Sequence, residues 1–358
     1  MPQYLSNDVA LYVTKTKEGS YNAGESTGTN YAKIRSQQAS FLLPQIEFLN
    51  DAGVPGNGHE FATQWCANYI SHPAATFTDD INYGIAGRLA LRALGGTVTT
   101  AQQGATTAYK HSCNMLSISS GRQYPSFSMA AELGGASYRF AGVVVDRFRM
   151  SQNRADRPQY SADLVGSGKF TTPHGLTSLP STMDIAACLT GAGVEVYWTD
   201  ADGTTTFSGS GCTLRSWSVE VANNLRLNDR CPGDSTQTLT YDSTTTTPAF
   251  AGKLLRGSRT VTAQLVILLD SSVVPWERYV TGQELTDVTF KAKSTALAGT
   301  GYNFTINYII PKARITSVDP TDSDGDAAIT INLVGMYDST SGGAIKAEVI
   351  NQETTAYA

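Results

Sequence analysis

The chain has 358 residues, of which 41% are hydrophobic and only 16% are charged, with a formal net charge of −5. This length suits two ordinary domains or one large domain. The charged fraction lies well below the roughly 25% that is usual for soluble domains. Its lysines and arginines are scattered, which argues against a surface that grips nucleic acid, because such surfaces cluster basic side chains against phosphates. The composition indicates a hydroxyl-rich surface that other subunits could cover.

The N-terminus and the cysteines favour a cytosolic protein. Residues 1–13 lack the basic segment and apolar run of a signal peptide, and no apolar run approaches the ~18 residues of a membrane span. The cysteines are odd in number and lack CxxC spacing, so neither a disulfide framework nor a zinc site is predicted. We expect reduced cysteines that pack mostly as small core residues. They are Cys66, Cys113, Cys188, Cys212 and Cys231.

Strand patterns dominate from the middle of the chain onward. The segments concerned alternate apolar with polar residues, are rich in β-branched residues and are bounded by Gly, Asp, Ser or Thr. They are 127–133, 138–150, 193–198, 210–221, 260–269, 287–293, 302–318 and 327–337. We therefore expect a mainly β fold.

The clearest helical pattern lies over residues 81–94, where apolar residues recur every four positions. Asp79 or Asp80 would cap the start of this helix, and Gly95 would end it. The pattern predicts one amphipathic helix between strands.

A shorter helix is predicted over 275–284, where Trp276, Tyr279 and Val280 share a face. Residues 182–193 fit a helix or a strand, and periodicity does not decide between them.

One strand pattern occurs twice. When Gly142 is aligned with Gly211, the apolar positions of GVVVDRFRMSQ and GCTLRSWSVEV coincide. In the first copy the alternation changes parity between Val145 and Phe148, and the second copy changes at the matching place. One extra residue moves every later side chain to the other face of a strand, so each copy predicts a β-bulge.

The repeat predicts two related modules. ADLV (162–165) recurs as AQLV (263–266), with a Thr-rich insertion in the second copy. We expect a first module over 1–175 and a second over 176–358, with a long inserted loop near 223–253. A structureless loop of that length is uncommon in a compact domain unless it contacts something, so we expect inter-subunit contacts there.

Asp146 and Arg215 fall at the two predicted bulges. Because a bulge re-aims its side chain, both are candidate inter-subunit contacts.

Several segments resemble the tail tube proteins of long, non-contractile-tailed bacteriophages. In the C-terminal half they are GCTLRSWSVEVANN, RGSRTVTAQLVILLD, TGYNFTINYIIPKARI and DAAITINLVGMYDS. In the N-terminal half they are GTNYAKIRSQQASFLLPQIEF and GGTVTTAQQGATTAYKHSCNMLSISSGRQYPSFSMAAEL. The resemblance covers most of the chain as a pattern of strands, glycines and aromatics.

The resemblance implies two β-sandwich or half-barrel modules with short flanking helices, which form a closed β-barrel tube on oligomerisation. It implies a ring of three chains with pseudo-sixfold symmetry, with six chains as the alternative, and rings that stack. The implied partners are other copies of the chain and the tape-measure, tail terminator and distal tail proteins, without a membrane. Genomic DNA would pass through the lumen without specific binding. The implied location is the virion tail, after assembly in the host cytoplasm.

No catalytic, cofactor or metal site emerges from the sequence. DPTDSDGDAA (319–328) has carboxylates like those of a calcium loop, but Ile331 occupies the position that requires Glu, and Asp324-Gly325 favours a two-residue hairpin turn. The histidines are isolated, and no glycine-rich segment completes a phosphate loop or a nucleophile elbow. We therefore expect a protein that is not an enzyme and holds no cofactor.

The strand aromatics leave one alternative open. Trp198, Trp217, Tyr197 and Phe148 are most simply core residues, but exposed aromatics would form a sugar-stacking platform. The alternative to a tube subunit is therefore a two-domain β-sandwich adhesin or carbohydrate-binding protein.

Overall fold

The structure is a computed structural model of the chain. It describes residues 9–35, 38–39, 42, 45–50, 65–71, 73–117, 123–133, 135–154, 156–183, 193–200, 203–207, 213–226, 255–269, 275–323 and 325–354. Most of the long loop predicted near 223–253, and of the ambiguous segment 182–193, lies outside these residues.

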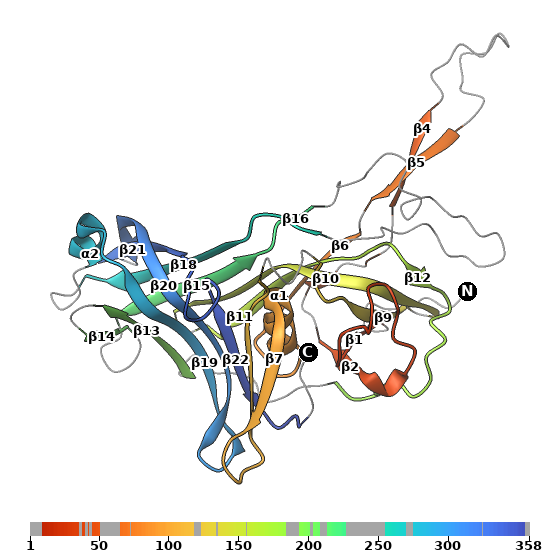
Figure 1. The fold of residues 1–358 in the computed structure, drawn as a ribbon, viewed down its shortest axis with the longest axis horizontal. Coiled ribbons are helices and arrows are strands. Elements are labelled where there is room, and N and C mark those ends of the chain that lie inside the picture. The colour runs from red at the N-terminus through yellow and green to blue at the C-terminus, as the bar shows by residue number, and fades with distance from the viewer. Residues whose placement is uncertain are drawn as a thin grey trace.

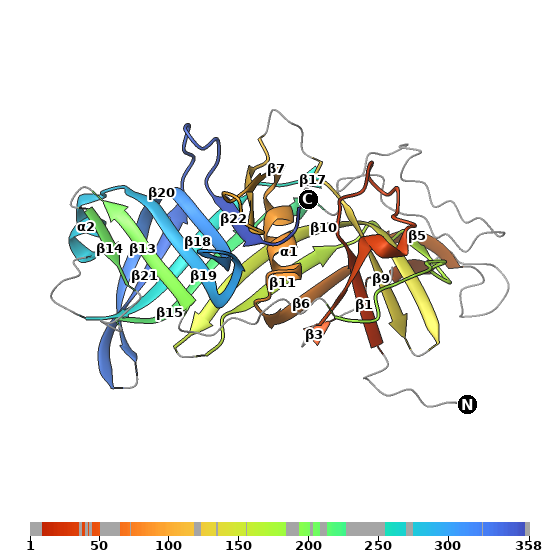
Figure 2. The same cartoon turned by 90° about the horizontal axis from the view of Figure 1, so that it is seen from below.

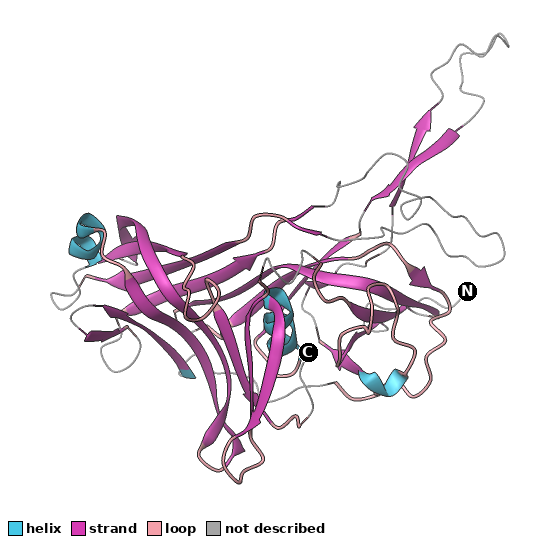
Figure 3. Ribbon diagram, in the orientation of Figure 1, coloured by secondary structure: helices cyan, strands magenta, loops and turns pink. Residues whose placement is uncertain are grey.

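The fold is mainly β, as predicted, and most of its strands form one large antiparallel sheet system, beside the two-stranded sheets β4–β5 and β16–β17 (Figures 1 and 3). The strands up to residue 171 are β1 (Val9–Thr14), β2 (Tyr31–Ile34), β3 (Gln38–Ala39), β4 (Gln45–Asn50), β5 (Trp65–Ser71), β6 (Ala74–Asp80), β7 (Gly95–Gln102), β8 (Tyr109–Met115), β9 (Phe127–Leu133), β10 (Ala136–Asn153), β11 (Gln159–Val165) and β12 (Phe170–Thr171). The later strands are β13 (Val194–Asp200), β14 (Gly203–Thr206), β15 (Leu214–Ala222), β16 (Leu225–Arg226), β17 (Leu255–Arg256), β18 (Thr260–Leu268), β19 (Leu285–Gly299), β20 (Tyr302–Ser323), β21 (Asp326–Gly335) and β22 (Lys346–Asn351). The α-helices are α1 (Ile85–Leu94) and α2 (Pro275–Thr281).

The strand pairing repeats along the chain. In the first unit, β1 to β12, the order across the sheet is β3-β6-β11-β10-β9-β1-β2, and β12 also pairs with β10. In the second unit, β13 to β22, the order is β15-β18-β21-β20-β19-β13-β14, and β22 also pairs with β20. Matching strands follow the same order along the chain, with α1 after β6 and α2 after β18. The predicted boundary between residues 175 and 176 falls between the two sets and stays a prediction.

The long strands β10 and β20 match closely. Core-facing residues of β10 are Tyr138, Phe140, Val143, Val145 and Phe148, and those of β20 are Tyr308, Ile310, Ala313, Ile315 and Val318. Each strand is bulged against its hairpin partner, between Val145 and Arg147 in β10 and between Ile315 and Ser317 in β20. The hairpin partners β11 and β21 both end in Leu-Val followed by Gly. β20 is therefore the counterpart of β10.

This pairing corrects the alignment proposed from the sequence. The predicted bulges are both present, in β10 and, between Leu214 and Ser216, in β15. However, β15 is the counterpart of β3, and β18 is the counterpart of β6, because each holds the same place in its unit. Apolar alternation repeats in any strand that is buried on one face, so it does not identify the strand's partners.

β10 and β15 pair with each other and join the units. Their register runs from Arg147 opposite Ala222 to Asn153 opposite Ser216. The first unit also contributes a hairpin, β7–β8, without a counterpart among the described residues of the second unit, and β8 pairs with β22. The two units therefore form one elongated body, with α1 near its centre and α2 at one end (Figure 2).

Among the described residues, the pairings do not close into a ring. β3 pairs only with β6, and beyond Ala313 the strand β20 pairs only with β21. The sheet that crosses the β10–β15 junction therefore ends in an open edge at β3 and another at β20.

The helix predictions are confirmed, with one correction. Gly95 has φ +70 and its N–H bonds to the carbonyl of Leu91, which ends α1 as expected. The predicted caps Asp79 and Asp80 are wrong, because both belong to β6; the Asn82 side chain instead accepts hydrogen bonds from the N–H groups that begin α1. α2 is shorter than predicted.

Candidate assembly surfaces

The junction between the units is closed at both ends by the bulges. The carbonyl of Asp146 accepts a hydrogen bond from the N–H of Asn223 (2.7 Å), and the carbonyl of Arg215 accepts one from the N–H of Arg154 (2.6 Å). Each bulge therefore binds the backbone just past the end of the other unit's strand. The similar sequence patterns of β10 and β15 therefore belong to the two strands that join the units.

The side chains of the two candidate contact residues have partners within the chain. Asp146 Oδ1 accepts from the N–H of Leu225 (2.8 Å), and Arg215 Nη2 lies 2.9 Å from Asp326 Oδ2. The Asp146 contact links the two units, whereas the Arg215 contact lies within the second unit. The assignment of Asp146 and Arg215 as inter-subunit contacts stays a prediction.

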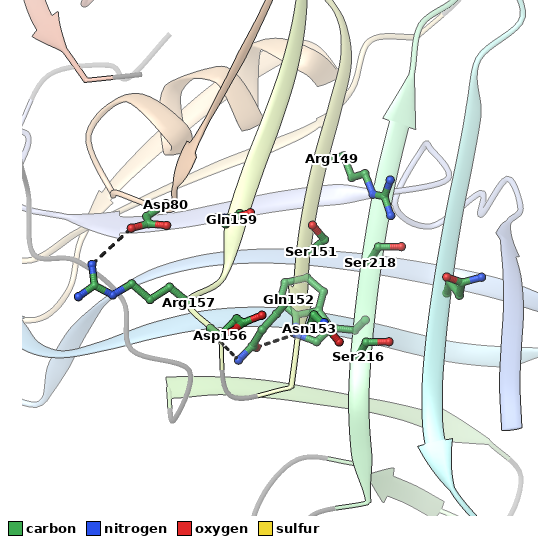
Figure 4. Close-up of a pocket in the computed structure, with 12 residues that line it drawn as sticks. Asp80, Arg149, Ser151, Gln152, Asn153, Asp156, Arg157, Gln159, Ser216 and Ser218 are labelled. Carbon is green, nitrogen blue, oxygen red and sulfur yellow. Dashed lines mark hydrogen bonds and ion pairs between the residues drawn. The ribbon is translucent and has the colours of Figure 1, made fainter. Parts of the chain in front are cut away.

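A polar groove of about 510 Å³ crosses the junction (Figure 4). Hydroxyl and amide side chains of β10, β15 and β18 supply much of its lining, among them Ser151, Ser216, Ser218 and Gln264. Trp217 donates its indole N–H to Gln152 below this surface (3.0 Å). The sheet face therefore offers many short, neutral hydrogen-bonding groups.

The charges on the same face are largely balanced. Arg147 lies 3.4 Å from Glu220 across the junction and 3.9 Å from Asp163 of β11. Arg157 of the groove lining pairs with Asp80 (3.4 Å), and Arg149 also lines the groove. Exposed pairs of this kind contribute little to stability, but they reduce the positive charge that could hold a phosphate backbone.

The two helices differ in their surroundings. Every residue of α1 is buried, and α1 lies against β10, β7 and β8 of its own unit and against β15 and β22 of the second unit. α2 lies against β20 of its own unit and exposes Trp276, Tyr279 and Val280. The sequence correctly placed these three side chains on one face, but periodicity does not reveal whether a face is covered.

The predicted core aromatics are buried at Trp198, Trp217 and Phe148, whereas Tyr197 is half-buried. They do not form an exposed platform. The exposed aromatic pair is instead Trp276 and Tyr279 of α2, whose ring centroids lie 5.7 Å apart.

The acidic segment near 319–328 forms a hairpin, as predicted. Ser323 pairs with Asp326 across a two-residue connection, and Gly325 has φ +84. Within the described residues, His, Cys, Asp and Glu do not gather in threes that could hold a metal ion. Cys113 is a buried free thiol, and burial raises its pKa to about 11. None of the described helices has the length and apolar character needed to cross a membrane.

Comparison with known proteins gives weak structural likenesses and no sequence match. No protein-family model matches the chain, and no curated protein matches it. Among solved structures, the tail tube of SPP1, determined by solid-state NMR and cryo EM, aligns with 47% of this chain and 81% of its own. The identity is 13% and the TM-score is 0.26.

Proposed function

We propose that the chain is a structural subunit of a bacteriophage tail tube, which assembles into rings that stack. The observation that supports this most directly is the repeat with its junction: two matching units join edge to edge through β10 and β15. The same arrangement leaves an edge on β20, the counterpart of β10, and an edge on β3, the counterpart of β15. A chain with complementary ends of this kind adds further copies until the ring closes.

In this proposal three chains supply six units, giving a ring with pseudo-sixfold symmetry. Closing the ring would remove the open edges, which otherwise promote irregular aggregation. The role is geometric and involves no catalysis. The protein would work in the virion tail after assembly in the host cytoplasm, with the tape-measure, terminator and distal tail proteins as partners.

The polar face across the junction fits the wall of a DNA conduit. DNA adheres to proteins mainly where basic side chains replace its counterions. Short hydroxyl groups supply much of the lining. Arg147 and Arg157 pair with Glu220 and Asp80, and Arg149 is the further basic side chain of the groove. Genomic DNA would therefore slide past this face during ejection.

The test is electron microscopy of the purified full chain over a range of concentrations. We expect rings or tubes, with three repeats of the full subunit in averaged end-on views. Six chains per ring would contradict the three-chain arrangement. A chain that stays monomeric at every concentration would contradict the proposed function.

The exposed Trp276–Tyr279 pair favours a second candidate, a carbohydrate-binding module. This candidate predicts a monomer that binds glycans through α2. A glycan array with the wild-type chain and a Trp276→Ala variant distinguishes the two: loss of a specific glycan signal in the variant supports carbohydrate binding, and its absence in both supports the tube.

A further inference from the structure

The second unit covers α1 with specific contacts. Tyr308 of β20 donates its hydroxyl hydrogen to the carbonyl of Ala90 in α1 (3.0 Å). Phe304, also of β20, stacks on Tyr83 just before the helix, with 5.5 Å between ring centroids. Strands β15 and β22 complete this cover. A helix of one unit is therefore a docking surface for the next unit along the chain.

α2 holds the matching place in the second unit. Arg88 of α1 donates to the carbonyl of Lys15 (2.6 Å), just past the end of β1. Arg278 of α2 lies 3.2 Å from Asp200, at the end of β13. Since β13 is the counterpart of β1, the two helices are anchored in the same way. Within the described residues, however, α2 packs mainly on β20 of its own unit, and Trp276 and Val280 are 56% and 66% exposed.

The strand on which α2 packs, β20, also carries an open edge. In β10, residues 147–153 pair with β15, whereas the matching segment of β20, residues 317–323, pairs with β21 on one side only. Because Ser323 and Asp326 close a two-residue hairpin, every second residue of β20 directs its N–H away from β21. Pro320 occupies one of these outward positions and offers no N–H, which protects the edge from indiscriminate pairing.

We propose that α2 and the open edge of β20 together receive the first unit of a second copy of this chain, in the way that α1 and β10 receive the second unit. This inference rests on the proposed function and identifies its contact surface. The edge would pair with β3 of the second copy. The same arrangement places Tyr138 of that copy over α2, with its hydroxyl directed at the carbonyl of Val280.

Tyr138 is suited to this contact. It is the counterpart of Tyr308 in the core-facing series of β10, and it is half-buried in the single chain. Its ring lies 6.2 Å from that of Phe140 and 6.3 Å from that of Phe170 on β12, the counterpart of β22. The Tyr138 side chain is thus held on β10 against β12. Their counterparts β20 and β22 are strands of the second unit that cover α1.

The two tyrosines provide a matched test. Removing one hydroxyl removes one hydrogen bond, which corresponds to about a 2- to 10-fold change in an equilibrium constant. We expect Tyr138→Phe to raise the concentration of unassembled protein at equilibrium by this factor, without a change in unfolding of the monomer. Tyr308→Phe should instead lower the stability of the monomer. The proposal is overturned if Tyr138→Phe assembles like wild type, or if it destabilises the monomer as Tyr308→Phe does.

A charge at the centre of the helix surface gives a larger effect. We expect Val280→Asp to prevent ring formation, measured by sedimentation velocity and microscopy, while circular dichroism and melting temperature of the monomer stay unchanged. Tyr337→Asp is the matched control, because Tyr337 is 70% exposed and lies outside α2. Tubes formed equally by wild type, Val280→Asp and Tyr138→Phe would overturn this inference and leave the proposed function standing.

Hydrogen exchange tests the strand edge separately. On assembly, the outward amides of Val318 and Asp322 should exchange more slowly, since they would pair with β3 of the next copy. The amide of Asn307, in the segment of β20 that pairs with β19 on one side and with β22 on the other, serves as the internal reference. Unchanged exchange at both outward amides in assembled tubes would overturn the edge contact.

Discussion

α1 and α2 occupy matching places in the two units but have opposite surroundings. α1 lies in the middle of the molecule, where the β7–β8 hairpin of its own unit and strands β15, β20 and β22 of the second unit enclose it. α2 lies at one end, packs mainly against β20 and exposes an aromatic pair. The same local design is complete in one unit and incomplete in the other.

This difference shows how duplication within one chain can make its halves unequal. The first unit has a hairpin after its helix, and β8 of that hairpin extends the sheet of the second unit through β22. The second unit passes directly from α2 to β19, so no hairpin of its own covers the exposed face of α2. In the proposed ring of three chains, the two units of each chain would therefore not be equivalent.

The largest expected difference between the helices concerns one buried position. Leu89 of α1 is 2% exposed, and its counterpart by helix start is Tyr279 of α2, which is 38% exposed. Leu89→Ala should lower the free energy of unfolding by about 3 kcal/mol, because a cavity remains in an enclosed core. Tyr279→Ala should lower it by about 1 kcal/mol or less in the unassembled chain. Urea denaturation of both variants below the assembly concentration measures this, and equal losses would contradict the comparison.

The bend in the long strands gives the next largest difference. Gly142 of β10 has φ +66, and a Cβ there would lie 1.7 Å from Asn22 Oδ1. Gly142→Ala should therefore cost about 2 kcal/mol or more, since it combines a left-handed backbone with a close contact. Its counterpart is Lys312 of β20, which pairs with Glu284 at 2.9 Å on the surface. Lys312→Ala should change the free energy of unfolding by about 0.5 kcal/mol or less, and the same urea series checks both.

Much of the strand content could be predicted because period-2 alternation follows directly from one-sided burial. The bulges at Asp146 and Arg215 could also be located, because an inserted residue leaves a visible change of parity. The partners of each strand could not, and that is why β15 was paired with β10 as a repeat when β20 is the counterpart. The better signal was available in the sequence: the core-facing residues from Tyr138 to Phe148 and from Tyr308 to Val318 have the same spacing.

The contact surface was less predictable than the fold. The sequence places Trp276, Tyr279 and Val280 on one helix face, but amphipathic periodicity is the same whether that face is covered by the chain itself or exposed. The cap of α1 was also misassigned, since Asp79 and Asp80 are acidic residues near a helix start but end a strand, where Arg35 pairs with them. Such contacts join residues far apart in sequence and leave no local pattern.

The docking of the β7–β8 hairpin should depend on pH. His111 of β8 is buried between Thr100 of β7 (2.8 Å to Nδ1) and Asn351 of β22 (2.9 Å to Nε2). Burial lowers the pKa of His111, and the hydrogen bond to Asn351 offsets this only in part. Below the unfolded histidine pKa of about 6.5 the unfolded chain therefore binds more protons than the folded chain, and stability falls as the pH falls.

The measurement is the melting temperature of wild type and His111→Gln between pH 7.5 and pH 5. His111→Gln should be less stable at neutral pH and should show a smaller loss on acidification. Parallel pH profiles for the two proteins would contradict this origin of the pH dependence. The second unit has no hairpin equivalent to β7–β8 among its described residues, so no matching histidine contact is expected there.

The smallest expected difference in stability concerns the first strand pair of each unit, β13–β19 in the second unit and β1–β9 in the first. Glu195 of β13 lies opposite Lys291 of β19, with 2.7 Å between the charged groups, and Lys293 lies 3.2 Å away. The matching pair in the first unit is Ala10 and Glu132, which lacks this ion pair. Burial opposes ionisation of Glu195, but the two lysines outweigh it and lower the pKa of the carboxyl.

Glu195→Gln should therefore lower the free energy of unfolding by about 0.5 kcal/mol or less at neutral pH, because the pair is exposed and screened by solvent. The sign follows from the lowered pKa: the contribution of Glu195 is complete above the ordinary carboxyl pKa and is lost as the pH falls through its folded value. Added salt should reduce the difference between the variants, since it screens exposed charges. Urea denaturation at low and high salt checks this, with Ala10→Ser as a control on the matching strand. A difference that persists at high salt and acidic pH would show that Glu195 stabilises the β13–β19 contact through packing and not through charge.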